Sequence, residues 1–374
     1  MGHCEAPRIR VERLDETVLF VASRRSYLED TCEMKFHALL PVRDEADIMV
    51  QCLQHLLRWV DAIYVFDTGS TDETWEIVNE CAGRDRRVKI LGKKAVYFSE
   101  VMVRGWMFNV AREFMTSGDW FLRVDADEVH HVLPPEFVRE SMRSCETLAY
   151  HQYYDFQLTE SEATEWDQRT DHAVERARPI EQRRRHFVPS IYSEPRLCRY
   201  RDTMRWPLGA SFPINAGYIA RERLPIRHYP HRDPEQLRGR CVLRATMMAS
   251  KQNSRYWSRP EHHHWSQSDW RKFVVSDDDP NLRCWVPGTP LPTYRFENHI
   301  ARHPKRLVQR VVHGLMLPVL DRLRSKWPSN AVPMPIGNQV TASLSTNREV
   351  NGFSEAMSGS VPSAGVGSAE VAVR

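Results

Sequence analysis

The fold is constrained most by a regular alternation of short apolar runs and amphipathic stretches between residues 35 and 125. The apolar runs have the length and composition of buried strands, and they span Lys35–Val42, Ala62–Phe66, Val88–Leu91 and Trp120–Val124. Between them, apolar residues recur at the three- and four-residue spacing of helices. Such alternation predicts βαβ units, and therefore an α/β fold with a mostly parallel sheet flanked by helices.

Three polar clusters follow the first, second and fourth of these predicted strands, at residues 43–45, 67–70 and 125–127. In open parallel sheets, ligands bind at the carboxyl ends of the strands. We therefore expect the three clusters to converge on one crevice, and this convergence carries the functional interpretation.

The pair Asp125 and Asp127 is the strongest chemical signal in the chain. Two carboxylates one residue apart, just past a strand end, can hold a hard divalent ion such as Mg²⁺ or Mn²⁺. The ion would fill its shell with water and diphosphate oxygens and offset charge on a departing nucleoside diphosphate. The alternative interpretation is a solvated acidic turn or a helix cap.

Asp67 stands at the end of the second predicted strand, where its carboxylate can accept a hydrogen bond from a ribose hydroxyl or a base N–H. Gly69 allows the backbone to come close to a ligand. Thr71 and Asp72 suit the cap of the following helix. Of this segment, Asp67 is therefore the candidate for donor binding.

A further helix is predicted over Val101–Met115. It precedes the strand Trp120–Val124, which is followed by the Asp-x-Asp motif of Asp125 and Asp127. Asn109 and Arg112 lie three residues apart on this helix and share a face. With Arg104 they are candidates for contact with donor phosphates, because a guanidinium is well shaped for that contact. The alternative is an ordinary exposed helix face.

Together, the segments LPVRDE at 40–45, FDTGSTDET at 66–74 and GDWFLRVDADE at 118–128 resemble glycosyltransferase family 2 in their order and spacing. The resemblance covers about residues 35–130 and continues more weakly to about 245. It implies the GT-A fold, a nucleotide-diphospho-sugar donor and, usually, inversion at the anomeric carbon. By the same resemblance, Arg43, Asp44 and Asp67 contact base and ribose, whereas Asp125 and Asp127 hold ribose and metal.

The chain departs from the family downstream of the Asp-x-Asp motif. Many members carry an acidic general base there, often in a His-Glu or Glu-Asp pair. Residues 195–200 (PRLCRY) are similar to the stretch that precedes this base, but residues 206–211 (WPLGAS) contain no such pair. An inverting transfer needs a base for the acceptor hydroxyl proton. The candidates are Asp202, Asp155, Glu160 and Asp233.

Histidines form two further clusters. The segment HYPHRDP at 228–234 resembles one found in some bacterial members of the family, and His228 or His231 is a candidate to join the metal shell or touch the diphosphate. The alternative is a turn in which backbone groups satisfy the imidazoles. The run at 262–264 is not expected to bind metal, because adjacent imidazoles point in different directions.

Past residue 130 the pattern is less regular. Strands are expected over Leu148–Phe156, Arg196–Arg201 and Ala216–Ile219, a polar loop or exposed helix over Glu160–Arg185, and helices over Pro134–Cys145, Pro234–Ser250 and Arg306–Lys326. The predicted organisation is an N-terminal extension (1–34), a nucleotide-sugar-binding half (35–130), an acceptor-side half with a helical C-terminal region (131–326) and a disordered tail (327–374).

The charge balance and the absence of targeting signals narrow the partners and the location. The net charge is +3, from 52 basic and 49 acidic residues, which is too small an excess to indicate nucleic acid. No stretch reaches the ~18 apolar residues of a membrane span, and eight cysteines without a Cys-x-x-Cys pair suit free thiols in a reducing compartment. These features predict a cytoplasmic protein, while local arginine runs permit peripheral membrane contact.

Two other functions compete with a metal-dependent transferase. A nucleotidyltransferase usually has a glycine-rich phosphate loop after its first strand, and residues 43–47 contain no glycine. The other candidate is a degenerate, non-catalytic protein that binds nucleotide or glycan. It is supported by the absence of the His-Glu or Glu-Asp pair that would supply the general base. The nucleotide, the sugar and the acceptor, whether a saccharide, a lipid-linked saccharide or a protein, are not identified by the sequence.

Overall fold

The computed structural model describes residues 34–95, 100–190, 192–207, 210–249 and 269–292. The expectations for the N-terminal extension, the helix at 306–326, the tail and the histidine run at 262–264 lie outside these residues. The predicted domain boundaries remain predictions.

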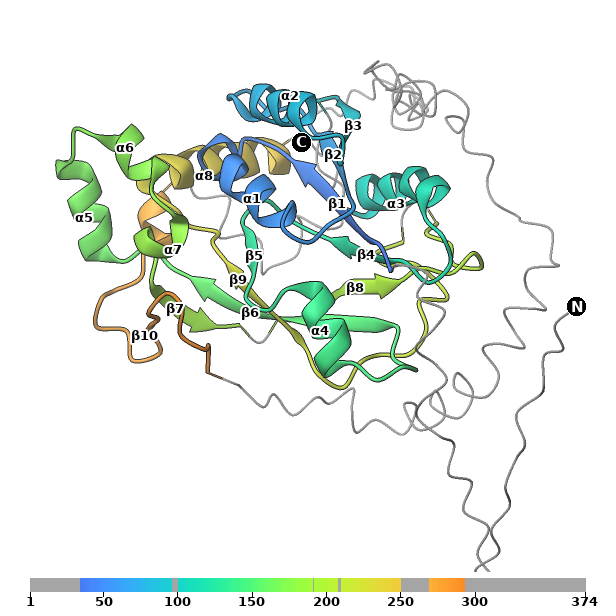
Figure 1. The fold of residues 1–374 in the computed structure, drawn as a ribbon. Helices are drawn as coiled ribbons and strands as arrows, with labels where there is room; N and C mark the ends of the chain where they lie inside the picture. The colour runs from blue at the N-terminus through green and yellow to red at the C-terminus, as the bar shows by residue number, and fades with distance from the viewer. Residues whose placement is uncertain (1–33, 96–99, 191, 208–209, 250–268, 293–374) are drawn as a thin grey trace, which may run out of the picture. The chain divides into compact units, whose positions relative to one another are not determined.

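The first part of the chain alternates strand and helix as predicted (Figure 1). β1 pairs in parallel with β2 and β4, and β2 pairs in parallel with β3, which gives the order β3-β2-β1-β4. The elements are β1 (Phe36–Val42), α1 (Ala46–Leu56), β2 (Ala62–Asp67), α2 (Thr74–Arg84), β3 (Val88–Lys93), α3 (Glu100–Ala111), η1 (Arg112–Phe114) and β4 (Trp120–Arg123).

Strands from the rest of the chain extend this sheet, mostly in the antiparallel sense. They are β5 (Glu128–His130), β6 (Leu148–Phe156), β7 (His186–Pro189), β8 (Pro195–Arg199), β9 (Leu224–His228) and β10 (Arg283–Cys284). β8 joins the two parts because it pairs antiparallel with both β4 and β6. β9 lies between β5, to which it is antiparallel, and β6, to which it is parallel. The α/β class is confirmed, and the parallel arrangement belongs chiefly to β1–β4.

The remaining helices pack around the sheet: α4 (Pro134–Ser141), α5 (Glu160–Gln168), α6 (His172–Ala177), α7 (Ile180–Arg183), α8 (Pro234–Ala249) and η3 (Trp270–Phe273). The polar segment at 160–185 thus contains three short helices. The prediction of a strand over Ala216–Ile219 was wrong. Within this range only Ile219 takes part in β-pairing, through an isolated bridge to Leu148. No helix in the described part of the chain is both long and apolar enough to cross a membrane.

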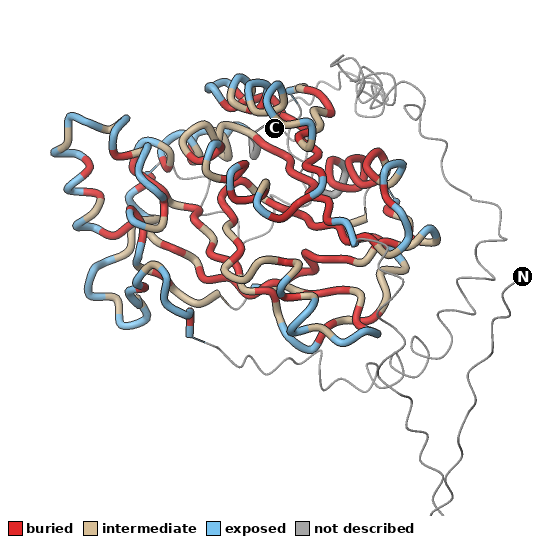
Figure 2. The backbone as a smooth tube through the Cα atoms, in the orientation of Figure 1, coloured by how far each residue is buried: buried red, intermediate tan, exposed pale blue. Residues whose placement is uncertain are grey.

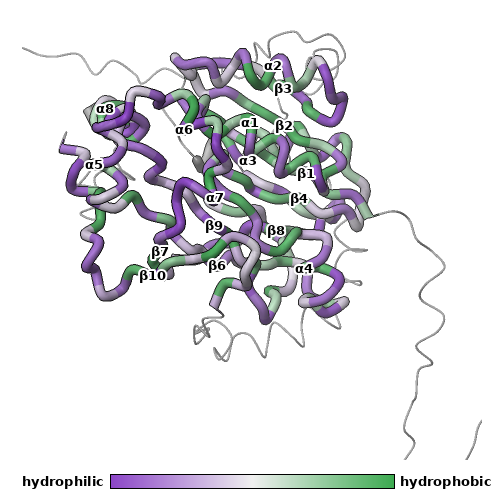
Figure 3. The backbone as a smooth tube through the Cα atoms, turned by 60° about the vertical axis from the view of Figure 1, so that its left-hand side comes forward, coloured by the Kyte–Doolittle hydropathy of each residue, from purple (hydrophilic) through white to green (hydrophobic). Residues whose placement is uncertain are grey.

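β1, β2 and β4 are buried along their whole length, as Figure 2 shows, and Figure 3 shows the apolar colouring of β1 and β2. Alternate residues of β1 belong to different core clusters: Leu40 lies in the cluster that contains Ile48 of α1, and Leu39 in the cluster that contains Phe108 of α3. Helices therefore cover both faces of β1 and β2. The carboxyl ends of the strands remain as the place where a ligand can reach polar groups.

Candidate functional site

The loops that follow β1 and β2 are tied together at the carboxyl edge of the sheet. The Asp44 amide donates to Ser70 Oγ (3.0 Å), and Asp44 Oδ1 accepts from the Thr71 amide (2.6 Å). Asp44 has a φ of 52°, a left-handed conformation that aspartate adopts more readily than most residues. Asp44 therefore shapes this loop, and Arg43 beside it donates to the carbonyl oxygen of Thr68 (3.3 Å).

Asp67, the last residue of β2, has one carboxylate oxygen engaged and one open. It is fully buried, and its Oδ1 accepts from the amides of Gly69 (2.8 Å) and Ser70 (2.7 Å). Its Oδ2 is buried and has no hydrogen-bond partner among the described residues. Such an oxygen costs free energy unless a ligand satisfies it. Gly69 has a φ of 107°, and a Cβ there would lie 2.6 Å from the Cα of Ala95.

Asp125 lies between two buried arginines just past β4. Arg104 Nη2 from α3 donates to its Oδ1 (2.5 Å), and Arg196 Nη2 from β8 donates to its Oδ2 (3.0 Å). Burial by itself would raise the pKa of this carboxyl, but Arg104 and Arg196 hold the pKa below its usual value. Asp125 is therefore ionised, and Arg104 contacts it directly.

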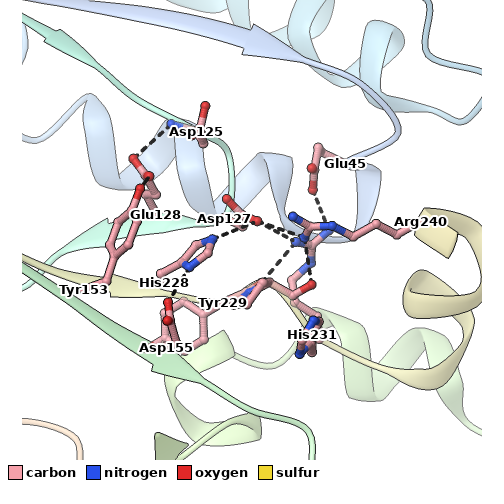
Figure 4. A network of polar contacts seen from close by, with 12 residues as sticks. Glu45, Asp125, Asp127, Glu128, Tyr153, Asp155, His228, Tyr229, His231 and Arg240 are labelled. Atoms are coloured by element: carbon pink, nitrogen blue, oxygen red, sulfur yellow. Dashed lines mark hydrogen bonds and ion pairs between the residues drawn. The ribbon is translucent and has the colours of Figure 1, made fainter. Parts of the chain in front are cut away.

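Asp127 is almost fully buried within a group of cations (Figure 4). Its Oδ2 lies 3.2 Å from Arg240 Nη1, 3.6 Å from His228 Nε2 and 3.8 Å from Arg232 Nη1. Burial would raise the pKa of this carboxyl, but His228 and the two arginines lower it. The carboxylate is thus held ionised at a position that a divalent ion could share.

His228 ends β9 between two carboxylates. The strand register places it opposite Glu128 on β5 and opposite Asp155 on β6. Its Nδ1 lies 2.7 Å from Asp155 Oδ1, and its ring stacks on Tyr153 with centroids 4.7 Å apart. Burial would lower the pKa of His228, but Asp127 and Asp155 raise it to about 10. His228 is an imidazolium at neutral pH in the metal-free protein.

This charge state predicts how stability depends on pH. Because the pKa of His228 is raised from 6.5 to about 10, its stabilisation is complete below pH 6.5 and is lost as the pH rises towards 10. With metal removed by chelation, His228→Asn should lower the free energy of unfolding by about 1–3 kcal/mol at pH 6. Urea unfolding at pH 6, 8 and 10 should show this difference shrinking, whereas a constant difference would contradict the assigned charge.

Glu128 belongs to the site although sequence reasoning missed it. It is buried, Arg196 Nη2 donates to its Oε1 (2.7 Å), and the Tyr153 hydroxyl donates to the same oxygen. Its Oε2 accepts from the Asp125 amide (3.2 Å). Burial raises the pKa of Glu128 to about 7, although Arg196 opposes this. Its position directly after the Asp-x-Asp motif was the available signal.

Two arginines of the site were also missed. Arg232 is fully buried and donates to Asp47 (2.6 and 2.9 Å) and Glu45 (2.5 Å) at the start of α1. Arg240 of α8 donates to Asp127 (3.2 Å). Arg232 lies within the histidine segment at 228–234, and Arg240 follows this segment. From the sequence, only the histidines and the aspartate of this segment were candidates for the site.

Three predicted residues lie away from this crevice. Asn109 donates to the Trp206 carbonyl oxygen (2.9 Å), and Arg112 donates to that of Asp202 (3.3 Å). Asp202 follows β8 beyond Arg199, which pairs with Trp120 at the amino end of β4. These residues are therefore at the opposite end of β4 from Asp125, which speaks against Asp202 as the base.

Of the other acidic candidates, only Asp155 faces the crevice residues, through His228. Asp233 is buried between Arg176 and Arg183 and accepts from the Gln236 amide at the start of α8. Glu160 is an exposed residue that begins α5. His231 turns towards Gln157 Oε1 (3.1 Å).

Asp127 and His228 are the crevice residues that could hold a divalent ion. No group of three or more metal-ligating side chains converges within the described ranges. Asp127 and His228 nevertheless offer a carboxylate and an imidazole 3.6 Å apart. Mg²⁺ and similar ions commonly use one or two protein ligands and complete the shell with water and phosphate oxygens. For His228 to bind such an ion, its imidazolium would have to release a proton.

Comparison with known proteins agrees with the sequence. Residues 38–186 match the sequence model of "Glycosyl transferase family 2". The match confirms the resemblance stated from the sequence and, with it, the α/β fold of the GT-A type. No curated protein matches the chain.

Solved structures give further similarities. A glucosyl-3-phosphoglycerate synthase from Mycobacterium tuberculosis in complex with Mn²⁺, UDP and phosphoglyceric acid is 23% identical, over 35% of this chain and 46% of its own, with a TM-score of 0.22. A mycobacterial protein is 24% identical over 33% and 42% (TM-score 0.23). The synthase with Mn²⁺, UDP and glucosyl-3-phosphoglycerate is 18% identical over 58% and 80% (TM-score 0.28).

The chain spans less than half the length of the first two of these structures. The family assignment therefore comes from the sequence match at 38–186, which includes β1–β4, the Asp67 loop and the Asp-x-Asp motif. Residues 38–186 therefore carry a domain that matches glycosyl transferase family 2, as the sequence resemblance indicated.

Proposed function

We propose that this protein transfers a sugar, as a hexosyltransferase, from a nucleotide-diphospho-sugar to an acceptor hydroxyl. The observation that carries the proposal is the open, buried Oδ2 of Asp67 at the same sheet edge as the ionised Asp125 and Asp127. Asp67 would accept a hydrogen bond from the base or ribose of the donor. Its neighbours Gly69 and Ser70 fix the carboxylate by donating to its other oxygen.

We assign Asp127 and His228 to the binding of Mg²⁺ or Mn²⁺. The bound ion would supply charge compensation for the departing nucleoside diphosphate. Around it, Arg232 and Arg240 keep Asp127 ionised in a buried position, and Asp155 holds the His228 ring through Nδ1. Arg104 and Arg196 fix Asp125 beside the ion site, where it can meet the donor ribose.

We further propose inversion by direct displacement, with Asp155 as the proton acceptor for the incoming hydroxyl. Asp155 is the candidate that lies beside the crevice residues, and its side chain keeps 25% of its surface exposed. A positioned base contributes about 10²–10⁴ to the rate.

The base assignment predicts that Asp155→Asn lowers kcat, measured at saturating Mn²⁺, by about 10²–10⁴. Because Asp155 also holds the His228 ring, the affinity for Mn²⁺ should fall by about 10- to 100-fold in the same variant. Turnover and Mn²⁺ titration on the same preparation check this. A kcat within a few-fold of the parent at saturating Mn²⁺ would contradict the base assignment and leave Asp155 only the role of orienting His228.

The proposed function is tested by incubating the protein with a panel of nucleotide-sugars, with Mn²⁺ or with chelator, and measuring release of nucleoside diphosphate. Release with one donor, dependent on the ion, is the expected result, since water can replace the acceptor. Binding of a nucleotide without release, across a panel of saccharide acceptors, would favour the degenerate binding protein.

A further inference from the structure

A polar cavity lies at the α5–α7 end of the protein. It has a volume of about 290 Å³ and is lined by side chains of α5, α6, α7 and the start of β7. Figure 1 shows these helices beyond β7, far along the sheet from β1–β3, and α5 is mostly hydrophilic in Figure 3. None of the crevice residues Asp67, Asp125, Asp127 and His228 lines it.

Two buried arginines face this cavity with part of their donors unused. The side chain of Arg183 has no exposed surface, and that of Arg184 has 5%. Nε and Nη1 of Arg183 and Nε of Arg184 have no hydrogen-bond partner among the described residues. Buried donors on a charged group cost free energy when they have no hydrogen-bond partner. These atoms therefore suggest that the cavity binds a ligand that accepts hydrogen bonds.

The acids near these arginines are already engaged elsewhere. Arg183 Nη2 reaches Asp233 Oδ2 at 3.2 Å, but Arg176 holds both oxygens of Asp233 at 2.8 and 3.1 Å. Arg184 Nη1 is 3.7 Å from Glu162 Oε2, which accepts from the Thr159 amide to cap α5. The neighbouring carboxylates therefore balance only part of the positive charge of Arg183 and Arg184.

Burial and the neighbouring Arg184 lower the pKa of Arg183 to about 10, as expected for two adjacent buried cations. The rim adds two more arginines, Arg169 and Arg178, which pair with Glu175 at 3.2 and 2.8 Å. Across the whole lining, five arginines face three glutamates. The cavity is therefore cationic, although it contains acids.

We propose that this cavity is a binding site for a phosphate group, separate from the donor crevice. Guanidinium groups match phosphate oxygens in geometry and remain charged at neutral pH. The volume lies at the low end of ligand pockets, so the ligand is inorganic phosphate or a small phosphate monoester. The proposal does not rest on the function proposed above, because it uses none of the crevice residues.

The test measures thermal stability of the full chain with inorganic phosphate or glycerol 3-phosphate, at ionic strength held constant with chloride. Chelator is present throughout, so that no divalent ion can recruit phosphate to the crevice. The variants are Arg184→Met and Arg178→Gln. The matched control is Arg221→Gln, which removes the same charge from a side chain that is 66% exposed.

At a ligand concentration roughly ten times the dissociation constant, the parent and Arg221→Gln should gain about 2–4 °C in Tm. Arg184→Met and Arg178→Gln should lose most of this gain; if Arg184→Met does not fold, Arg178→Gln decides. A larger gain with glycerol 3-phosphate than with inorganic phosphate would identify the monoester as the ligand.

A second titration checks that the cavity is separate from the donor crevice. A nucleoside diphosphate is titrated with Mn²⁺ into the variants, which should bind it with the same affinity as the parent. The proposal is overturned if phosphate gives no gain in the parent, if both cavity variants keep the full gain, or if they lose nucleotide binding in parallel. Failure of nucleotide binding in the parent itself would count against the proposed function alone.

Discussion

Asp127→Asn is expected to lower kcat/KM for sugar transfer by about 10³-fold. The substitution keeps the shape of the side chain but removes the negative charge that lies 3.2–3.8 Å from His228, Arg232 and Arg240. Removal of one group that stabilises transition-state charge commonly costs 10²–10³ in rate, and loss of the divalent ion adds to this.

The measurement is a steady-state transfer or donor-hydrolysis assay over a range of Mn²⁺ concentrations. Asp278→Asn, which makes the same chemical change at an exposed position, is the matched control and should behave as the parent. Circular dichroism confirms that both variants are folded. Turnover of Asp127→Asn within a few-fold of the parent would remove the metal role from this residue.

Arg232→Met should lower the free energy of unfolding by about 3 kcal/mol, because it leaves the partly buried carboxylates of Glu45 and Asp47 without their partner. Arg232 has no exposed surface and joins β9 and α8 to the start of α1 through Glu45 and Asp47. Methionine fills much of the volume, so the loss reports the charge rather than a cavity.

Chemical denaturation of the parent, Arg232→Met and Arg221→Met measures this effect. Arg221→Met makes the same substitution on a mostly exposed side chain and should change stability by less than about 0.5 kcal/mol. A loss below about 1 kcal/mol for Arg232→Met would mean that the carboxylates of α1 are satisfied in another way. It would also weaken the view that Arg232 holds Asp127 in place.

The parallel half of the fold followed from sequence because its signals are local. Each of β1–β4 is a short apolar run, and the residues after β1, β2 and β4 are the polar ones that reach the crevice. The sequence pattern alone therefore predicts that Asp67 and Asp125 lie at strand ends. The helix at 101–115 was also predicted, although its last turn is the 3₁₀ segment η1.

The rest of the site depends on contacts between residues far apart in sequence. β9, which carries His228, has five residues, includes Pro225, and gains its partners only from β5 and β6. Arg240 meets Asp127 across 113 positions. The spacing of apolar residues along the sequence gives no information about such contacts between distant residues. Asn109 and Arg112 share a helix face, as predicted, but that face meets the loop at 202–206 instead of the crevice.

The most direct test of the account is calorimetric titration of nucleoside diphosphates into the parent and Asp67→Asn, with and without Mn²⁺. Asparagine can replace the acceptor that binds Gly69 and Ser70, but it presents an amide donor where the open oxygen stood. The account predicts Mn²⁺-dependent binding of one nucleotide to the parent, weakened about 10- to 100-fold in Asp67→Asn. Equal affinity in both proteins, or no binding to the parent with Mn²⁺, would contradict the claim that this crevice holds a nucleotide-sugar donor.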